Sequence, residues 1–210
     1  MNRVICIGRE FGSGGREMGR RLADELGFAY YDKEVIDEIV EKTPFSEEYV
    51  KNIVEGKRQQ LYPINERSSI AIADNYQIRQ LQSIYTAQSD VIREMALKSD
   101  CVIVGRCADY ILEDVEEIQI FKLFVYADLE ARVKRCYERA PEDEKLTEKE
   151  MIKQINKIDK ARASYYSNFT LRKWGDKKYY DFCINTTGVD IEAMVPHFAK
   201  IFTLPPKPKA

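Results

Sequence analysis

Residues 4–22 have the sequence VICIGREFGSGGREMGRRL, in which an apolar run is followed by a glycine-rich turn and then by a helical pattern. Met18 and Leu22 fall on one face of that helix. Glycines allow a tight turn whose backbone N–H groups converge, and the start of the helix adds its own unpaired N–H groups. The stretch therefore predicts a loop that binds phosphate. The alternative is a turn that serves only to pack the strand against the helix.

The loop departs from the GxxxxGK[ST] pattern of phosphate-binding loops. Aligned on residues 12–14, Gly15 stands at the lysine position and Glu17 stands at the hydroxyl position. Arg9 and Arg16 flank the loop and could supply the positive charge that the lysine normally brings to the phosphates. Glu17 could contact Mg²⁺ directly or through water, or it could repel a polyphosphate.

A dinucleotide-binding loop is the competing interpretation, because Asp32 lies 20 residues after Gly12 at the end of a strand-like run. Such loops need a third glycine, however, and the residue at that position is Glu17. Asp32 is also placed to act as the N-cap of a helix that begins at Lys33, and a capping residue can still contact a ligand.

Five short apolar runs, separated by helical patterns, extend this picture to the whole chain. The runs cover residues 3–8, 28–32, 101–106, 121–128 and 179–186. Most are continuously apolar, as is typical of strands in a parallel sheet that is covered on both faces. The alternation of strands and helices predicts a doubly wound α/β fold, in which ligands bind beyond the carboxyl ends of the strands.

The third apolar run ends in Gly105 and Arg106, at the edge where a ligand is expected. A glycine there lets the backbone bend toward a ligand, and an arginine offers a planar fork for a phosphate or a base edge. Asp109 follows closely and could orient Arg106 or contact the ligand itself. The alternative for Arg106 is an ion pair with a surface acid.

The helical pattern after the fourth run carries Arg132, Arg135 and Arg139 at spacings that place them on one face. A polar connection, residues 141–150, leads to a second helical pattern with its own basic residues, Lys157, Lys160 and Arg162. Phosphoryl transfer requires mainly positioning and charge neutralisation. The two segments therefore predict a mobile lid that closes over phosphates. A solvated helix face would show the same pattern.

The composition limits the partners of the chain. Its 210 residues include 33 basic and 35 acidic ones, and the net charge of -2 gives no reason to expect nucleic acid or an anionic membrane. The five cysteines form no CxxC pair, and His197 is the single histidine, so neither a disulfide framework nor a histidine-based metal site is indicated. We expect a cytoplasmic protein with a small-molecule partner, and we predict no oligomeric state.

Three stretches resemble the cytidylate kinases, which belong to the P-loop nucleoside monophosphate kinase group: REFGSGGREMGRRLA (9–23), IVGRCADY (103–110) and CINTTGVDIEAMV (183–195). The resemblance is closest to the cytidylate kinase-like branch, in which REFGSGGRE and YYDK replace the usual segments. It implies a three-layer αβα P-loop kinase fold with a five-stranded parallel sheet and a helical lid. It also implies one domain over residues 1–210, with an acceptor-binding insertion at about 33–95 and the lid at about 132–170.

The resemblance implies ATP and Mg²⁺ as cofactors and CMP, dCMP or a related small molecule as acceptor. The residues expected to bind ATP, with Glu17 at the metal, are Arg9, Gly12, Ser13, Gly14, Gly15, Arg16, Glu17, Thr186 and Thr187. Those expected to bind the acceptor are Asp32, Arg106, Asp109 and Lys160. The expected catalytic residues are Arg16, Arg106, Arg132 and Arg162.

Departures from the pattern of the family leave two further hypotheses open. Val104 replaces an Asp before Gly105, Asn185 replaces the Asp of the last turn, and the loop lysine is missing. These changes favour a catalytically silent module that binds a nucleotide or another anion. Residues 43–95 show no clear match to the usual cytosine-recognising segment, which favours a kinase for a non-nucleotide small molecule.

Overall fold

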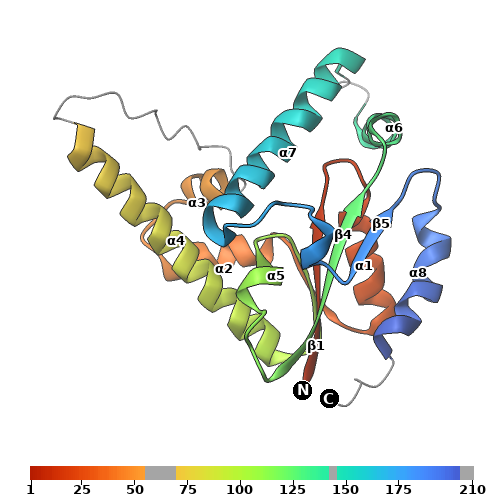
Figure 1. Cartoon of the computed structure of the whole chain (residues 1–210), viewed down its shortest axis with the longest axis horizontal. Helices are drawn as coiled ribbons and strands as arrows, with labels where there is room; N and C mark the ends of the chain where they lie inside the picture. The colour runs from red at the N-terminus through yellow and green to blue at the C-terminus, as the bar shows by residue number, and fades with distance from the viewer. Residues whose placement is uncertain (55–69, 142–145, 204–210) are drawn as a thin grey trace.

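The computed structural model describes residues 1–54, 70–141 and 146–203, with the backbone alone at 70–78. Strands and helices alternate along this part of the chain (Figure 1). The strands are β1 Asn2–Arg9, β2 Ala29–Tyr31, β3 Cys101–Val104, β4 Ile118–Tyr126 and β5 Phe182–Asn185. The helices are α1 Gly15–Leu26, α2 Glu34–Lys42, α3 Glu47–Val54, α4 Ile70–Lys98, α5 Ala108–Ile111, α6 Leu129–Arg139, α7 Glu148–Thr170 and α8 Ile191–Ala199, with 3₁₀ turns η2 Lys177–Tyr179 and η3 Lys200–Thr203.

The described strands form one sheet in the order β2-β3-β1-β4-β5, and every neighbouring pair is parallel. Val4 of β1 lies opposite Cys101 on one side and Ile120 on the other. The predicted five-stranded parallel sheet is therefore confirmed. Because β1 is the middle strand and the strand order reverses there, its carboxyl end opens at the point where such sheets usually bind ligands.

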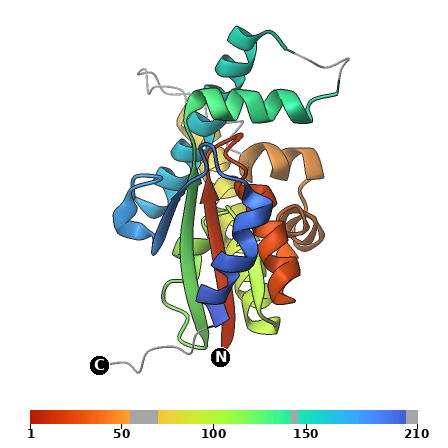
Figure 2. The same ribbon diagram turned by 90° about the vertical axis from the view of Figure 1, so that its right-hand side faces the viewer.

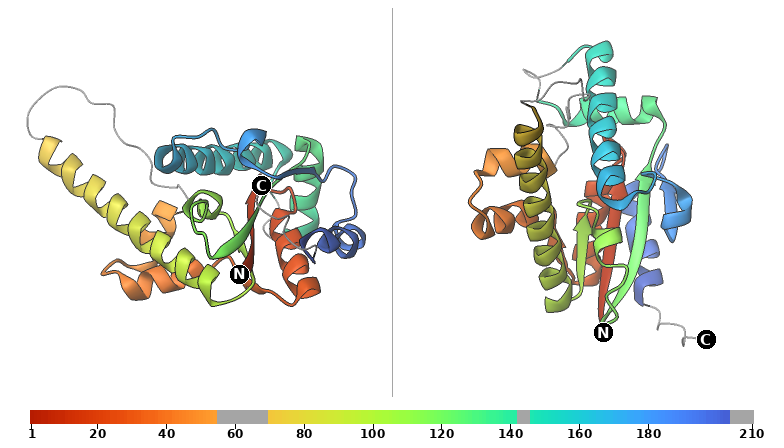
Figure 3. Two further views of the ribbon diagram at one scale, coloured as in Figure 1. Left: turned by 60° about the horizontal axis from the view of Figure 1, so that its bottom comes forward. Right: turned by 60° about the vertical axis from the view of Figure 1, so that its left-hand side comes forward.

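Helices cover both faces of the sheet, because successive side chains of each strand point to opposite sides. Val4 and Cys6 join a core with α2, α3, α4 and α5, whereas Ile5 and Ile7 join a second core with α1 and α8. Figure 1 shows α1 and α8 on one side and α2 and α4 on the other, and Figure 3 shows the same arrangement from two further directions. The predicted three-layer α/β class is confirmed.

Helix α6 and the first part of α7 lie over the carboxyl ends of the strands (Figure 2). They share a small core of their own, made by Val133, Met151 and Ile155. The Thr147 side chain and the Glu150 carboxylate cap the start of α7 reciprocally. Farther along α7, Tyr165 joins the core of the sheet, so one helix connects the layer above the strands to the main body.

Within the described ranges, no helix is long and apolar enough to span a membrane.

Candidate active site at the carboxyl edge of the sheet

The glycine loop (residues 8–17) connects β1 to α1 at this edge of the sheet. Gly12 and Gly14 have φ angles of 78° and 82°, a conformation that glycine adopts without a steric penalty. No described residue accepts a hydrogen bond from the backbone N–H groups of Gly12, Gly14, Gly15, Arg16 and Glu17. Converging free N–H groups at a helix start attract anions. The loop therefore has the donor set that a phosphate requires.

Other elements bind the carbonyl groups of the loop and hold them away from these donors. Arg162 donates to the Arg9 carbonyl at 3.1 Å, and Arg135 donates to the Gly12 carbonyl at 2.8 Å. The Thr186 hydroxyl donates to the Ser13 carbonyl at 2.6 Å. Because these bonds come from α6, α7 and the turn after β5, three separate elements fix the orientation of the loop before any ligand arrives.

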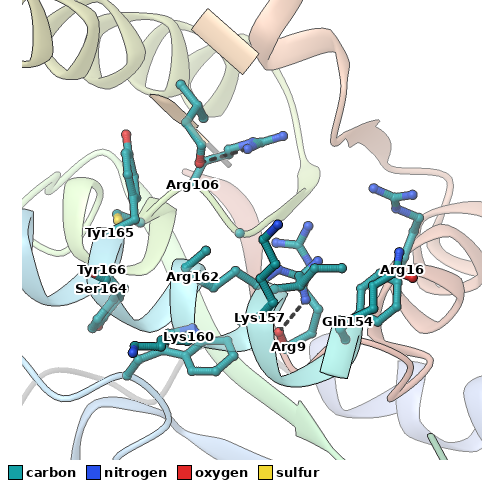
Figure 4. Close-up of a pocket in the computed structure, with 18 of the residues that line it drawn as sticks. Arg9, Arg16, Arg106, Gln154, Lys157, Lys160, Arg162, Ser164, Tyr165 and Tyr166 are labelled. Carbon is teal, nitrogen blue, oxygen red and sulfur yellow. Dashed lines mark hydrogen bonds between the residues drawn. The ribbon is translucent and has the colours of Figure 1, made fainter. Parts of the chain in front are cut away.

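A cavity of about 1020 Å³ lies beside the loop, between the ends of β1 and β3 and one face of α7. Basic side chains dominate its charged lining: Arg9, Arg16, Arg106, Lys153, Lys157, Lys160 and Arg162 (Figure 4). The acidic residues among the described lining are Asp109 and Glu150. A cavity with this excess of positive charge is suited to a ligand with several negative charges.

Arg9 occupies the space in which a side chain at position 15 would begin. A Cβ atom at Gly15 would lie 2.6 Å from the Cβ of Arg9, and one at Gly105 would lie 1.8 Å from the Arg9 Nη1. Real Cβ atoms essentially never approach other atoms so closely. Arg9 thus runs across the floor of the cavity between two glycines. A lysine at position 15 would not fit unless Arg9 moved.

The Asp32 carboxylate lies between Arg9 and Arg16. Its Oδ2 is 2.7 Å from the Arg16 Nε, and its Oδ1 is 3.6 Å from the Arg9 Nη2. Asp32 is 4% exposed, whereas the Arg16 side chain is 58% exposed. Burial, and then the positive charge of Arg162, lower the pKa of Arg9 well below its ordinary value. Asp32, which is predicted to bind the acceptor, therefore pairs with the guanidinium groups of Arg9 and Arg16 in the loop.

Arg162 and Arg106 enter the cavity from α7 and from the end of β3. Burial lowers the pKa of Arg162 to about 10, and Asp159 partly offsets this shift. Arg106 has a left-handed φ of 60°, which turns its side chain toward α3, where it donates to the Val54 carbonyl at 3.2 Å. Gln88 donates to the Arg106 carbonyl at 2.8 Å and supports this backbone conformation.

Comparison with known protein families identifies the family of this chain. The model of the cytidylate kinase-like family matches residues 4–188. The chain belongs to the cytidylate kinase-like family. A crystal structure of an uncharacterized protein from Eubacterium ventriosum ATCC 27560 has 29% identity and a TM-score of 0.67, and the match covers 96% of this chain and 99% of that one.

Two shikimate kinases, from Acinetobacter baumannii and Bacteroides thetaiotaomicron, are more distant, with identities of 14% and 13% and TM-scores of 0.47. These matches cover 97% of this chain and 93% and 99% of the shikimate kinases. Among the curated proteins, none matches the chain.

In this cytidylate kinase-like chain, Arg132 lies outside the lining of the cavity. It is 6% exposed, and its Nη1 contacts Glu10 at 2.8 Å and Asp159 at 3.0 Å. Asp159 also accepts a hydrogen bond from the Phe11 N–H at 2.7 Å. Arg132 thus joins α6, α7 and the glycine loop. Its catalytic role stays a prediction, because in this conformation its guanidinium is bound to carboxylates instead of facing the cavity.

Glu17 lies outside the lining of the cavity and faces α6. It forms ion pairs with Arg21, at 3.0 Å, and with Arg139. The described residues contain no group of three His, Cys, Asp or Glu side chains that could hold a metal ion. With Glu17 paired and Val104 at the strand end, the described residues do not fit a protein-held Mg²⁺, and we derive no step through one. The metal role of Glu17 stays a prediction.

The remaining predicted residues divide between the cavity and its supports. Lys160 and Asp109 line the cavity, and buried Asp109 accepts a hydrogen bond from the Tyr166 hydroxyl at 2.7 Å. Thr186 is buried against the loop, and the Thr187 hydroxyl accepts a hydrogen bond from the Asp128 N–H at 2.8 Å. Thr186 thus supports the loop, and the roles of Thr186 and Thr187 toward a nucleotide stay predictions.

Several residues of the site were missed by the site prediction. Lys153 lines the cavity from the face of α7 that also carries Lys157 and Lys160, and its helical spacing was a usable signal; Lys157 was named as a basic residue of the predicted lid but not among the binding residues. Trp174 and Tyr180 line it from the connection between α7 and β5. No periodic pattern marks that connection, so only the tertiary structure places these two side chains in the cavity.

Proposed function

We propose that the protein is an ATP-dependent phosphotransferase that acts on a small anionic acceptor, with CMP and dCMP as the first candidates. The observation that carries this proposal is the basic cavity beside a loop with free N–H groups. A triphosphate on the loop would end beside Arg9 and Arg16, and a phosphate-bearing acceptor would be held by Arg106 and the basic face of α7.

The proposed chemistry needs charge neutralisation more than it needs a base. An acceptor phosphate is already an anion at neutral pH, so its oxygen can attack the γ-phosphoryl group without a side chain to remove a proton. The guanidinium groups of Arg9, Arg16 and Arg162 would balance the charge that spreads over the transferred group. Closure of residues 132–170 as a lid over the cavity, within a single domain, is part of this proposal.

Coupled measurement of ADP release tests the proposal over a panel of nucleoside monophosphates, sugars and small alcohols, with ATP and Mg²⁺ supplied. Release with CMP or dCMP is the expected result, and release only with a sugar or an alcohol would support the non-nucleotide kinase.

Arg16→Ala should lower turnover by at least about 100-fold, in the range for loss of one transition-state contact. The matched control is Arg20→Ala, one turn along α1 and outside the cavity; equal turnover of the two variants would remove Arg16 from the mechanism.

A catalytically silent anion-binding module is the second candidate. Two observations favour it: Asp32 already neutralises Arg9 and Arg16, and Glu17 is held by Arg139 and Arg21. Calorimetric binding of ATP without ADP release for every acceptor would support this candidate over the enzyme. Absence of binding to any adenine or guanine triphosphate would contradict the phosphotransferase, and absence of binding to inorganic phosphate and tripolyphosphate as well would contradict the module.

A further inference from the structure

Three consecutive residues after β3 form a strained turn (residues 105–107) with left-handed backbone angles. Gly105, Arg106 and Cys107 have φ values of 78°, 60° and 55°. Glycine adopts this conformation freely, but Arg106 and Cys107 carry Cβ atoms and adopt it at a cost. Such strain persists only where the surrounding structure imposes it, and it is concentrated at ligand-binding sites. Contacts from other elements must therefore hold the strained turn in place.

Gln88 of α4 makes one of these contacts. Its side chain is 0% exposed and lies outside the lining of the cavity. Its Nε2 donates to the Arg106 carbonyl at 2.8 Å, and its Oε1 accepts a hydrogen bond from the Tyr165 hydroxyl of α7 at 3.1 Å. The rings of Tyr85 and Phe169 stack with centroids 4.1 Å apart and hold the same two helices together. One buried amide thus links α4, the strained turn and α7.

The chemistry of its partners fixes the orientation of this amide. A backbone carbonyl can only accept a hydrogen bond, so the Nε2 of Gln88 must face Arg106 and the Oε1 must face Tyr165. Tyr165 must then donate. Burial raises the pKa of Tyr165 well above its ordinary value, so the hydroxyl keeps its proton for that bond. The donors therefore run in one direction, from Tyr165 through Gln88 to the Arg106 carbonyl.

The backbone conformation of Arg106 also decides where its guanidinium lies. The Nη1 donates to the Val54 carbonyl at 3.2 Å, and the side chain lines the cavity, as Tyr165 does (Figure 4). Rotation of the backbone into the ordinary right-handed region would turn this side chain in another direction. A contact that fixes the Arg106 carbonyl therefore also fixes the guanidinium.

We propose that Gln88 is a positioning residue, which holds Arg106 in the strained turn so that its guanidinium binds the phosphate of the acceptor. This inference rests on the proposed function, in which Arg106 holds that phosphate, and it adds a residue that lies outside the lining of the cavity. Tyr165 takes part through its hydroxyl. The acceptor site is thereby tied to α7, because a movement that broke the Tyr165 bond would release Gln88.

Gln88→Met tests the proposal by calorimetry on the full chain. Methionine is also unbranched and flexible, but it cannot donate to the Arg106 carbonyl. The acceptor probe is the tightest binder among CMP, dCMP and ribose 5-phosphate. Its affinity should fall about 10-fold, in the range for one hydrogen bond to a charged group, while the affinity for ATP on the glycine loop stays unchanged. A general loss of stability would lower both affinities, so equal losses would overturn the proposal.

Gln80→Met is the matched control. Gln80 also lies on α4 and accepts a hydrogen bond from a tyrosine hydroxyl, that of Tyr49 at 2.7 Å. Its partner belongs to α3, however, and Gln80 lies outside the lining of the cavity. The same exchange there should leave both affinities unchanged. A loss of acceptor affinity equal to that in Gln88→Met would overturn the proposal, since any lost polar contact on α4 would then weaken binding.

Tyr165→Phe removes only the hydroxyl and tests whether it acts through Gln88. Alone it should weaken binding of the acceptor probe about 2- to 5-fold, because the amide loses the partner that fixes its orientation. In the double variant with Gln88→Met, the loss should be no larger than in Gln88→Met alone. Additive losses would contradict this route and would show that the hydroxyl contacts the acceptor. An unchanged affinity in Tyr165→Phe would also overturn the proposal, and this milder change decides the matter if Gln88→Met does not fold.

Crystal structures without ligand separate this inference from the proposed function. The φ of Arg106 should be positive in the wild-type chain and negative in Gln88→Met, and a positive φ in the variant would overturn the positioning role. This result is independent of turnover, so a positive outcome without ADP release for any acceptor would keep the positioning role and contradict the phosphotransferase. ADP release with an unaltered acceptor KM in Gln88→Met would keep the phosphotransferase and contradict the positioning role.

Discussion

Arg9 provides a physical reason for the missing lysine of the glycine loop. Its Cβ fills the position where a side chain of residue 15 would start, and its guanidinium lies against Gly105. Asp32 lies beside it and balances its charge. The structure thus has a positive charge at the end of β1, whereas the phosphate-binding loop pattern has one at the start of α1. Gly15 and Gly105 leave the space that Arg9 occupies.

Asp32→Asn should destabilise the protein far more than Arg16→Ala does. Removing the carboxylate leaves the buried Arg9 charge without its counterion, which costs about 3 kcal/mol when a buried pair is broken. The Arg16 side chain is 58% exposed, so its loss should cost less than about 1 kcal/mol. Urea denaturation at constant ionic strength measures both free energies of unfolding. The reverse order would show that Asp32 does not stabilise Arg9.

Sequence reasoning found much of the site at this scale because the carboxyl ends of parallel strands meet at one edge. That rule brought Arg9, Arg106 and Asp109 to the same cavity. It could not show that Glu17 pairs with Arg139, or that Arg132 is buried between two carboxylates. Those pairings depend on the exact placement of α6 over the loop, and residue spacing along one helix does not reveal it.

At the scale of elements, the glycine loop is one part of a three-element assembly. Helices α6 and α7 bind its carbonyl groups through Arg135 and Arg162, and Arg132 ties both helices to Glu10. In the predicted lid range, the structure thus has helices that already contact the loop. Any closing motion would have to break or carry along these bonds.

Gly15→Ala at the start of α1 should lower the stability of the protein more than Gly27→Ala, which changes the glycine directly after α1. The new Cβ would meet the Cβ of Arg9 at 2.6 Å, and neither atom is the end of a flexible chain, so overpacking should cost about 1–3 kcal/mol. Displacing Arg9 should also weaken triphosphate binding, measured by calorimetry. Gly27→Ala is the control: it ends α1 with a φ of 67° and no atom within 4 Å, so only about 1 kcal/mol of backbone strain is expected. Equal triphosphate affinities in the two variants would contradict a contribution of Arg9 to triphosphate binding.

Sequence patterns predicted the strands well and the connections less well. Continuous apolar runs identify buried parallel strands, so each predicted run overlaps a strand of the structure. Helix α5 was missed. It follows Arg106 and Cys107, which both have left-handed φ angles although neither is glycine. Tertiary contacts such as the Gln88 bond to the Arg106 carbonyl stabilise this conformation, and they are invisible in the local sequence.

At the scale of the whole molecule, charge is distributed unevenly. The chain has a net charge of -2, yet its cavity gathers basic side chains from β1, α1, β3 and α7. A local positive field in a protein of negative net charge attracts small anions to the cavity, without giving the whole surface the positive charge that favours nucleic acid. Composition alone gives no reason to expect nucleic acid as a partner, and it could not locate a site for small anions.

Lys157→Glu should weaken binding of inorganic tripolyphosphate about 5- to 10-fold, because it reverses one charge that lines the cavity. Lys178→Glu makes the same change in net charge on an exposed residue outside the cavity and should leave the affinity unchanged. Calorimetry at low and high salt checks both values, and the difference should shrink at high salt. Equal losses in the two variants would mean that net charge, and not the cavity, governs the binding.

The clamped carbonyl groups of the glycine loop have a consequence for the cost of recognition. A loop that must order itself around its guest loses conformational freedom at that moment, and this loss is subtracted from the affinity. Here α6, α7 and the turn after β5 have already restricted the loop during folding. Hydrogen–deuterium exchange should therefore find the amides of Gly12, Gly14, Gly15, Arg16 and Glu17 unprotected although the loop is held in place, and a bound anion should slow their exchange without changing the exchange of neighbouring amides.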